Sequence, residues 1–395
     1  MVEPSVRVPK TRVELADIVR RFGLKYTSQY GRQMMPSQKR ALSDIVACCT
    51  PELGGRRYRC DDCKESFWQY HCCRNRACPK CHGTQIREWL QRREAELLPC
   101  DYFHGVVTVP SELRAVFHRH QKAMYGLLMQ ISAEAIKELC ARKRHLGALP
   151  GILCVLHTWT GQLGYHPHAH LLITGGGVTP DGQHWEPARE EFLVPVTLLS
   201  RKIAAKFRDA LKAKMPAVFA GVPPDVWQRE WVTFLKHYGQ GNDAVLKYLS
   251  RYVFRTAISN ARILGMDQTH VTFRWKDRGA DAWRIERLPG VEFLRRFLQH
   301  VLPRGFHRVR YYGLWHPSKR DESNRAWVLL ILATPADTAQ PLRISSLSEA
   351  LSELTAPADR AVDAAADHDA ALPRCPHCGS CRTRFLGEYP RFGVP

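Results

Sequence analysis

Long apolar runs are missing from this 395-residue sequence. The longest one, Ala326 to Ala333, is far shorter than the ~20 residues that a membrane-spanning helix needs. The N-terminal segment, MVEPSVRVPK, lacks the apolar core of a signal peptide. No internal repeat is visible, which excludes solenoids and propellers. These absences predict a soluble, cytoplasmic protein with no membrane partner.

Acidic residues are scarce relative to basic ones. The chain has 38 Asp and Glu against 58 Lys and Arg, which gives a formal net charge of +20. Such an excess attracts polyanions, so nucleic acid is the first partner to consider. Cysteine, by contrast, is abundant at 14 residues. In a reducing compartment, paired cysteine spacings indicate metal sites rather than disulfides.

Composition divides the chain into four stretches. Residues 1–98 are basic and rich in cysteine, and residues 99–333 alternate strand-like and helix-like patterns. Residues 334–373 are rich in Ala, Asp, Ser and Pro, and residues 374–395 hold a second group of cysteines. Short strands that pair through hairpins and are interrupted by helices predict an α+β domain for residues 99–333. We expect a small metal-binding module before this domain, and a linker and a small cysteine cluster after it.

The N-terminal stretch contains two Cys-x2-Cys pairs at the spacing of a zinc ribbon. Cys60 and Cys63 form the first pair, and Cys78 and Cys81 form the second. In a zinc ribbon, two turns place four thiolates around one Zn²⁺. We therefore predict that these four residues form one Zn²⁺ site. Alternative ligands in the same stretch are His71, His82, Cys72 and Cys73, of which Cys73 is the first to consider.

The C-terminal cysteines make only half of such a ribbon. Cys375 and Cys378 form a Cys-x2-Cys pair, and Cys381 follows. The missing ligands could be Cys381 and His377, or could come from elsewhere in the fold, so a second Zn²⁺ at this cluster is a hypothesis. Five other cysteines have no partner spacing and are predicted to act as small hydrophobes: Cys48, Cys49, Cys100, Cys140 and Cys154.

Three histidines alternate along the segment GYHPHAHLLITGGG. The period of two in a strand places His166, His168 and His170 on one face. Several imidazoles on one face can bind a divalent metal ion and leave coordination positions open for phosphate oxygens. His157, on the preceding predicted strand, is the first candidate for a third ligand if the two strands pair. His166, Gln162 or an acidic residue from elsewhere are the alternatives.

Two tyrosines lie four residues apart in the segment KYLSRYVFRT. In a helix this offset leaves Tyr248 and Tyr252 only ~40° apart around the axis, so both hydroxyls face the same side. Lys247, Arg251 and Arg255 accompany them. A pair of tyrosines at this spacing is by itself more often packing than chemistry, so its meaning depends on the histidines.

The histidines and the tyrosines together suit one reaction. A phenol is a poor nucleophile at neutral pH, but it can attack phosphorus where a metal ion polarises the phosphodiester. The attack forms a phosphotyrosine and releases a 3′ hydroxyl. Because the phosphotyrosine keeps the energy of the broken bond, a 3′ hydroxyl can later rejoin strands without ATP. Two tyrosines would let one site hold one 5′ end while it cleaves a second strand.

Five segments, taken together, resemble the insertion sequence 91 family of rolling-circle transposases. They occur in the family's order and span roughly residues 30–320, with RCPHCG near the C-terminus as a sixth match. The five segments are YHCCRNRACPKCHG, HTWTGQLGYHPHAHLLITGGG, KYLSRYVFRTAISNARI, VTFRWKDR and EFLRRFLQHVLPRGFHRVRYYGLWHP.

The resemblance implies a fold and a set of site residues. The implied HUH-type fold is an antiparallel sheet with flanking helices and the histidines on a central strand, plus a zinc-ribbon-like N-terminal module. His168 and His170 match the HUH motif (histidine, bulky apolar residue, histidine), which binds Mg²⁺ or Mn²⁺, although Ala169 between them is smaller than usual. Tyr248 and Tyr252 match the two catalytic tyrosines. The family's zinc-binding cysteines fall on Cys60, Cys63, Cys78 and Cys81.

The resemblance also implies a function. The expected protein is an enzyme that nicks single-stranded or hairpin ends of its own element and transfers the strands to a short target sequence through 5′-phosphotyrosines. Lys247 or Arg251 would stabilise the developing charge. The alternatives are a plasmid replication initiator or relaxase with the same chemistry, a metal hydrolase that uses water, and a non-catalytic zinc-ribbon DNA-binding protein.

Basic residues outside these motifs are candidates for DNA contacts. Between Phe293 and Arg320 there are seven Lys and Arg and no Asp or Glu, a pattern typical of phosphate-binding segments. The loop between the two N-terminal cysteine pairs is also basic. The predicted DNA-binding residues are Arg74, Arg76, Lys80, Arg255, Arg295, Arg296, Arg308 and Arg310.

Overall fold

The fold is taken from a computed structural model. The structure describes residues 13–81, 97–240, 256–277, 279–333 and 372–390, together with Val245, Tyr248, Tyr252 and Val253. The described helices are α1 (Leu15–Tyr30), α2 (Pro36–Ala47), α4 (Arg114–Arg119), α5 (Gln121–Cys140), α6 (Val196–Lys214), α7 (Pro216–Ala220), α9 (Gly290–Leu298) and α10 (Arg320–Ala333). Among these residues, no helix is long and apolar enough to cross a membrane.

The strands form four antiparallel sheets, three of which shape the molecule. The described strands are β1 (Gly55–Cys60), β2 (Ser66–Tyr70), β3 (Asp101–Thr108), β4 (Gly151–Trp159), β5 (Tyr165–Thr174), β6 (Gly176–Val178), β7 (Trp185–Pro187), β8 (Thr233–Gln240), β9 (Ile263–Met266), β10 (His270–Asp277), β11 (Ala282–Pro289), β12 (Val309–Gly313) and β13 (Thr383–Tyr389). The mixed α/β class with antiparallel sheets, predicted from the sequence, is confirmed.

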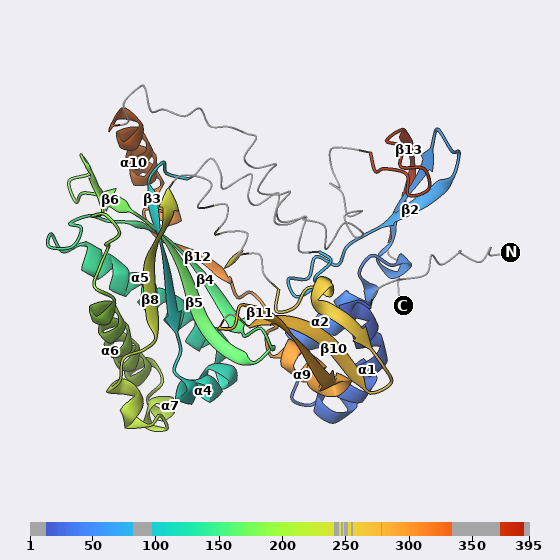
Figure 1. The fold of residues 1–395 in the computed structure, drawn as a ribbon, viewed down its shortest axis with the longest axis horizontal. Coiled ribbons are helices and arrows are strands. Elements are labelled where there is room, and N and C mark those ends of the chain that lie inside the picture. The colour runs from blue at the N-terminus through green and yellow to red at the C-terminus, as the bar shows by residue number, and fades with distance from the viewer. Residues whose placement is uncertain are drawn as a thin grey trace.

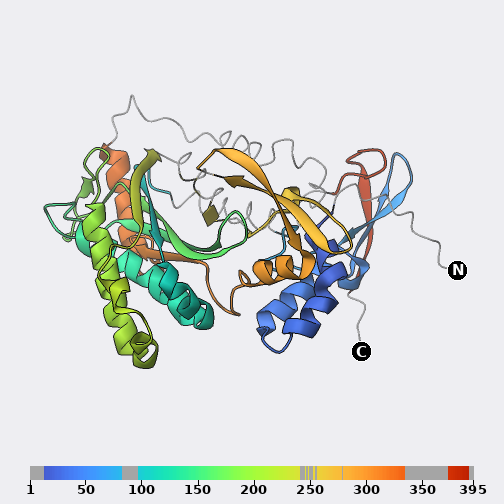
Figure 2. The same cartoon turned by 60° about the horizontal axis from the view of Figure 1, so that its bottom comes forward.

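The largest sheet has the strand order β12-β4-β5-β3-β8, so β5 is its middle strand (Figure 1). Helices α5 and α6 lie side by side against one face (Figure 2). The sequence of α6 explains its docking, because Leu199, Ile203, Phe207 and Leu211 recur every four residues and are all buried. Burial of each such side chain contributes ~1.5–3 kcal/mol to the free energy of folding. This face of the sheet is therefore covered by a hydrophobic core and is not available for a site.

The opposite face of the same sheet carries the histidines. Directly opposed residues of an antiparallel pair share a face, and β5 aligns His170 with Val155 and His168 with His157 of β4. A second core forms on this face from Leu172 and neighbouring sheet residues, Ala326 of α10 and Tyr248. The segment that holds the tyrosines therefore packs on the face of the sheet that carries the histidines.

A second lobe combines both halves of the chain (Figure 1). Helices α1 and α2 share one core with α9 and the sheet β11-β10-β9. At the contact between α1 and α9, a Cβ on Gly290 would come within 2.4 Å of the Phe22 ring, so only glycine allows this approach. The predicted boundary at residue 98 therefore does not separate two cores, because the apolar face of α1 is covered by α9, which belongs to the predicted domain of residues 99–333.

A three-stranded ribbon, with the order β13-β1-β2, joins the two ends of the described chain. Strand β13 pairs with β1 from Gly55 opposite Tyr389 to Cys60 opposite Thr383. The C-terminal cysteine segment, predicted as a separate cluster over residues 374–395, is thus part of the N-terminal ribbon. The predicted linker, apart from its last two residues, lies outside the described residues.

Candidate active site

Three histidines converge on one face of the sheet. His157 of β4 lies in register with His168 of β5, and His170 lies two residues farther along β5. One ring nitrogen from each of the three lies within 4.8 Å of the others. His157 and His170 are buried, whereas His168 is half-buried. The structure therefore brings together the three predicted ligands, with one side of the group open.

Hydrogen bonds set the protonation of two of these rings. His168 donates Nδ1–H to the His166 carbonyl at 2.7 Å, and His157 donates Nε2–H to the Tyr252 carbonyl at 2.5 Å. A carbonyl can only accept, so each bond places the proton on the named nitrogen and the lone pair on the other one. A neutral imidazole held in this way is the form that binds a metal ion.

The alternative third ligands have other partners. Arg114 donates to Nδ1 of His166 at 2.9 Å, which turns that ring toward α4. Gln162 donates to Glu286 at 3.3 Å. His157 is therefore the best-placed third ligand among the described residues.

His104 of β3 belongs to the same site, although the sequence analysis missed it. Its Nε2 lies 3.1 Å from Nδ1 of His170, and the two rings stack. With Nδ1–H of His170 as the donor, the lone pair on Nε2 of His170 is directed to a metal. The available signal was a histidine within the mostly apolar strand FHGVVTV. The alternation of the strand puts His104 on the face of His170.

The two predicted nucleophiles lie beside these rings in unequal surroundings. The centroid of the Tyr252 ring is 4.2 Å from that of His170, and Tyr252 is half-buried. The Tyr248 ring lies 5.0 Å from Tyr252 but is fully buried. Its hydroxyl has no hydrogen-bond partner among the described residues, and burial raises the pKa of Tyr248 well above its usual value. Lys247, Arg251 and Arg255 fall outside the described residues.

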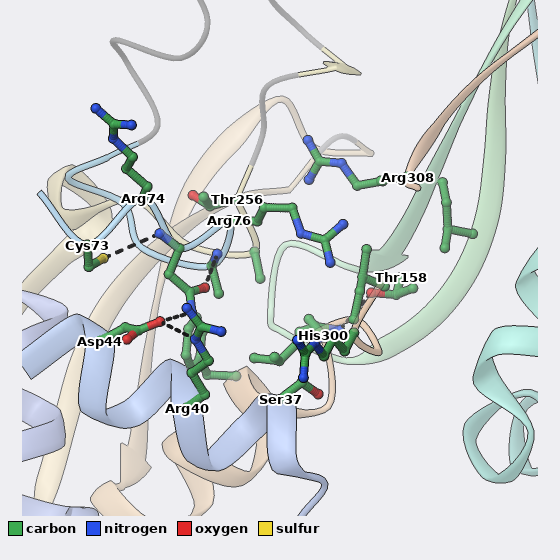
Figure 3. Close-up of a pocket in the computed structure, with 18 of the residues that line it drawn as sticks. Ser37, Arg40, Asp44, Cys73, Arg74, Arg76, Thr158, Thr256, His300 and Arg308 are labelled. Carbon is green, nitrogen blue, oxygen red and sulfur yellow. Dashed lines mark hydrogen bonds and ion pairs between the residues drawn. The ribbon is translucent and has the colours of Figure 1, made fainter. Parts of the chain in front are cut away.

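A cavity of about 340 Å³ lies between the loop at residues 73–77 and the end of β4 (Figure 3). One of its lining residues, Trp159, stacks on the ring of His157 at a centroid distance of 4.6 Å. Asp44 is the one acidic residue among the described residues that line it, and it pairs with Arg40 at 3.3 Å. Burial, reinforced by the charge of Arg76, lowers the pKa of Arg308 to about 10. Five arginines line the cavity: Arg40, Arg74, Arg76, Arg304 and Arg308.

The cavity is also connected to the tyrosine segment. Arg308 donates to the carbonyl of Val253, the residue after Tyr252. Arg76 donates to the carbonyls of Phe306 and Pro303. Backbone carbonyls thus orient Arg76 and Arg308 at the cavity wall.

The other predicted DNA-binding residues are engaged within the protein. Lys80 pairs with Glu14 at 2.7 Å. Arg295 and Arg296 both pair with Glu292, at 2.6 and 2.8 Å. Arg310 lies over the Phe306 ring at 5.1 Å. None of these four residues lines the cavity.

His300 forms part of the cavity wall and makes the fold sensitive to pH. Its Nδ1 lies 3.1 Å from the Thr158 hydroxyl, its Nε2–H donates to the Leu163 carbonyl, and burial lowers its pKa from 6.5 to about 4. Between pH 6.5 and 4 the unfolded chain binds a proton that the folded chain does not, so stability falls as the pH falls through this window. We expect a loss of up to about 3 kcal/mol. As the pH is lowered from 6.5 to 4, the thermal unfolding midpoint should fall less steeply in His300→Gln than in the wild type. An equal pH dependence in the two proteins would contradict the assignment of this effect to His300.

The cysteines form two four-thiol clusters rather than one ribbon site, and Cys49 and Cys72 form a third group that shares Cys48 with the first cluster. The Sγ atoms of Cys48, Cys73, Cys78 and Cys81 lie within 4.8 Å of one another. The prediction that Cys60, Cys63, Cys78 and Cys81 share one site is therefore wrong. The hairpin β1-β2 carries the first pair to its tip, while the second pair returns to its base beside the end of α2, where Cys48 lies.

Cys48 and Cys49 are thus cluster members and not the small hydrophobes that their spacing predicts. A hydrogen bond from Cys49, followed by bonds from neighbouring thiols, lowers the pKa of Cys48 far below its usual value. Cys73, the first of the alternative ligands, lies in the same cluster. His71 is instead 3.3 Å from Glu388, and His82 lies outside the described residues.

Comparisons with known proteins identify the family. Residues 151–323 match a family model described as "Putative transposase", and residues 18–109 match the "Transposase zinc-binding domain". This zinc-binding domain and the cysteine clusters support Zn²⁺ as a resident metal. No solved structure matches the chain.

Two relatives cover most of the chain. A protein named "Putative transposase y4qJ" from Sinorhizobium fredii is 36% identical over 348 residues, which are 83% of this chain and 87% of the relative. The "Transposase for insertion sequence element IS801" from Pseudomonas savastanoi pv. phaseolicola is 27% identical over 292 residues, which are 69% of this chain and 68% of the relative. The family predicted from the motifs is confirmed: the chain belongs to the insertion sequence 91 family of rolling-circle transposases.

Proposed function

We propose that this transposase cleaves single-stranded DNA with Tyr252 as its first nucleophile, at a divalent ion held by His157, His168 and His170. The observation that carries the proposal is the position of the Tyr252 ring, 4.2 Å from the ring of His170. Three imidazole nitrogens within 4.8 Å of one another lie at the same place. Histidines on the middle strand of an antiparallel sheet, with tyrosines on the same face, are the arrangement that an HUH-type fold predicts.

The donor set fits a divalent cation. Three neutral imidazoles are an incomplete shell for a metal ion, so a bound ion would keep positions for phosphate oxygens. Such an ion would neutralise charge that develops on the scissile phosphate. Mg²⁺ prefers oxygen ligands and nitrogen donors suit it poorly, so Mn²⁺ should support cleavage at a lower concentration than Mg²⁺.

The residues of the chain supply the rest of the reaction. The Tyr252 oxygen attacks phosphorus and loses its proton to solvent, while the 3′ oxygen leaves and takes up a proton. The 5′ phosphate is then attached to Tyr252, and a 3′ hydroxyl of another strand can reverse the step. Tyr248, buried 5.0 Å away, would take part only after the segment has rearranged to expose its hydroxyl.

The arginine cavity supports the proposal that the DNA is single-stranded. The cavity measures about 340 Å³, and one of its lining residues, Arg308, donates to the carbonyl of Val253 in the tyrosine segment. A single strand can turn its phosphates into such a space, whereas the stiffness of a duplex opposes that bend. We therefore propose that phosphates next to the cleaved bond lie against Arg76, Arg304 and Arg308.

Substitutions in the cavity should weaken DNA binding through charge. We expect Arg304→Gln and Arg76→Gln each to reduce the slope of log affinity against log salt by ~0.7, the value for one lost phosphate contact on single-stranded DNA. Arg208→Gln, on the outer surface of α6 beside Asp209, is the matched control and should leave the slope unchanged. Binding of a labelled oligonucleotide between low and moderate salt would measure all three. Equal slopes for the cavity variants and the wild type would rule out these contacts.

The experiment that tests the proposed function is a denaturing gel of the purified protein with single-stranded DNA carrying the element's ends. A 3′ label should become covalently attached to the protein in Mn²⁺ and not in EDTA, while a 5′ label should be released as a fragment with a 3′ hydroxyl. Cleavage without an adduct would indicate a nuclease that uses water. Binding without cleavage would indicate a non-catalytic DNA-binding protein.

A further inference from the structure

The ribbon β13-β1-β2 holds four cysteines from opposite ends of the chain. Cys60 is the last residue of β1 and Cys63 lies in the turn that follows, whereas Cys375 and Cys378 come from the segment before β13. All four Sγ atoms lie within 4.8 Å of one another. The distance from Cys60 to Cys378 is 3.6 Å, and that from Cys63 to Cys375 is 3.5 Å, measured between sulfur atoms. Four thiolates around a tetrahedral Zn²⁺ at ~2.3 Å would be separated by ~3.8 Å, so the cluster already has nearly this size.

The backbone holds each pair in a tight turn. Cys60 donates its N–H to the Glu65 carbonyl at 2.9 Å, and Cys375 donates its N–H to the Ser380 carbonyl at 2.8 Å. Gly379, with φ of +75°, closes the second turn by donating to the Cys375 carbonyl at 2.9 Å. In each turn the two thiols point in the same direction. The thiols of the first turn face those of the second.

Contacts outside the cysteines keep the two turns in register. Asp61 donates its backbone N–H to the Arg382 carbonyl at 2.9 Å. The Asp62 carboxylate accepts from the Ser380 hydroxyl and from the Arg382 guanidinium. The first turn is thus tied to the second at three points, independently of any thiol.

The ribbon has almost no hydrophobic core of its own. Its buried cluster consists of Tyr58, Cys60, Phe67 and Cys375, with Cys63 packed against it. A module with so little apolar burial needs a metal or a disulfide to be stable. Two of the four cysteines, Cys60 and Cys375, are themselves members of this small core, and Cys63 packs against it.

We infer that Cys60, Cys63, Cys375 and Cys378 bind a structural Zn²⁺ that fastens the C-terminal strand to the N-terminal hairpin. All four positions of the ion are filled by thiolates, so the site is closed and has no position for a substrate. It is separate from the cluster at Cys48, Cys73, Cys78 and Cys81, and its C-terminal pair lies far beyond residues 18–109, where the zinc-binding domain matches. Cys381 and His377, the neighbouring candidates, are not part of the cluster.

Zinc stoichiometry of the full-length protein tests the inference. After dialysis against Mn²⁺, which fills the histidine site, elemental analysis of Cys375→Ser/Cys378→Ser should give one Zn²⁺ fewer per chain than the wild type. The matched control is Cys381→Ser, which removes an exposed thiol of the same segment and should keep the wild-type content. Equal zinc content in the double variant and the wild type would overturn the inference, as would an equal loss in the control.

A second measurement does not depend on whether the double variant folds. A protease recognition sequence inserted between residues 334 and 371 allows the wild-type chain to be cut after it has folded. The C-terminal fragment should co-elute with the rest of the protein while Zn²⁺ is bound, and should separate after the metal is chelated under reducing conditions. A fragment that separates from the zinc-loaded protein, or that stays bound after chelation, would overturn the inference. Neither measurement involves DNA cleavage, so the outcome is independent of the proposed function.

Discussion

The variant Tyr252→Phe is expected to lose the first cleavage of single-stranded DNA, whereas Tyr248→Phe is expected to retain it. The two hydroxyls are only four residues apart, but their surroundings differ. Tyr252 is half-buried and packs on the His170 and His104 rings. Tyr248 is fully buried, and burial raises its pKa well above the usual value. A phenol in that position cannot lose its proton or reach a phosphate without first being exposed.

The expected loss is large because the hydroxyl is the nucleophile. Removal of a nucleophile from an enzyme that acts through a covalent intermediate typically costs at least about 10³-fold in rate. Tyr252→Phe should therefore give no detectable adduct with 3′-labelled DNA. Tyr248→Phe should form the adduct at nearly the wild-type rate and should fail at a later step, when a second strand is cleaved or joined.

The control is Tyr312→Phe. Tyr312, on β12, is also a largely buried tyrosine, and burial raises its pKa to about 12, but it packs against the core on the opposite face of the sheet. Removal of its hydroxyl should leave both steps intact. An adduct that persists in Tyr252→Phe and disappears in Tyr248→Phe would reverse the proposed order. An adduct in the double Tyr→Phe variant would exclude tyrosine as the nucleophile.

The local part of the site is predictable from the sequence because it depends on periodicity. A period of two places His168 and His170 on one face of a strand, and a short connection brings the preceding strand alongside, so His157 follows. The tyrosine spacing is similarly local. The order of helices and strands over residues 99–333 is predictable for the same reason. Its apolar segments are long enough for their periodicity to distinguish a helix from a strand.

The remaining features depend on contacts between distant residues. The sequence spacing of Cys60, Cys63, Cys78 and Cys81 suggests one ribbon, but the partners of Cys60 lie more than three hundred residues away, at Cys375 and Cys378. The sequence around β1 does not predict which strand will pair with its free edge. The packing of α1 on α9 cannot be predicted from the sequence for the same reason. The pattern of an amphipathic helix predicts that its apolar face is buried, but it does not identify the element that covers that face.

Removal of a ligand histidine is expected to have the second large effect. In His168→Ala the proposed ion would keep two of its three protein ligands, and stabilisation of the charge on the phosphate would be lost. Lewis-acid stabilisation is worth several kcal/mol, and about 4 kcal/mol corresponds to about 10³-fold in rate. We therefore expect adduct formation to fall at least about 10³-fold at a Mn²⁺ concentration that saturates the wild type, while binding of the same oligonucleotide in EDTA is unchanged. Wild-type rates in His168→Ala would show that the histidines do not hold the ion.

His104 allows a finer test of the same site, because it touches a ligand rather than the metal. It is a positioning residue: its Nε2 lies 3.1 Å from Nδ1 of His170 and fixes that ring. His104→Phe keeps a ring at this position and removes the acceptor. Loss of such a partner typically weakens metal affinity 10–100-fold. The Mn²⁺ concentration for half-maximal cleavage should rise by about that factor, and the rate at saturating Mn²⁺ should return close to the wild-type value.

The same substitution at His237 separates this effect from damage to the sheet. His237 lies on β8 opposite Phe103, on the face that packs against α5 and α6, and its Nε2 is 3.5 Å from Asp101. His237→Phe should therefore leave the Mn²⁺ dependence unchanged. If excess Mn²⁺ does not rescue His104→Phe, the residue supports the fold and not the ligand. If His104→Phe has the wild-type Mn²⁺ dependence, the orientation of His170 does not depend on this hydrogen bond, because packing alone then holds the ring.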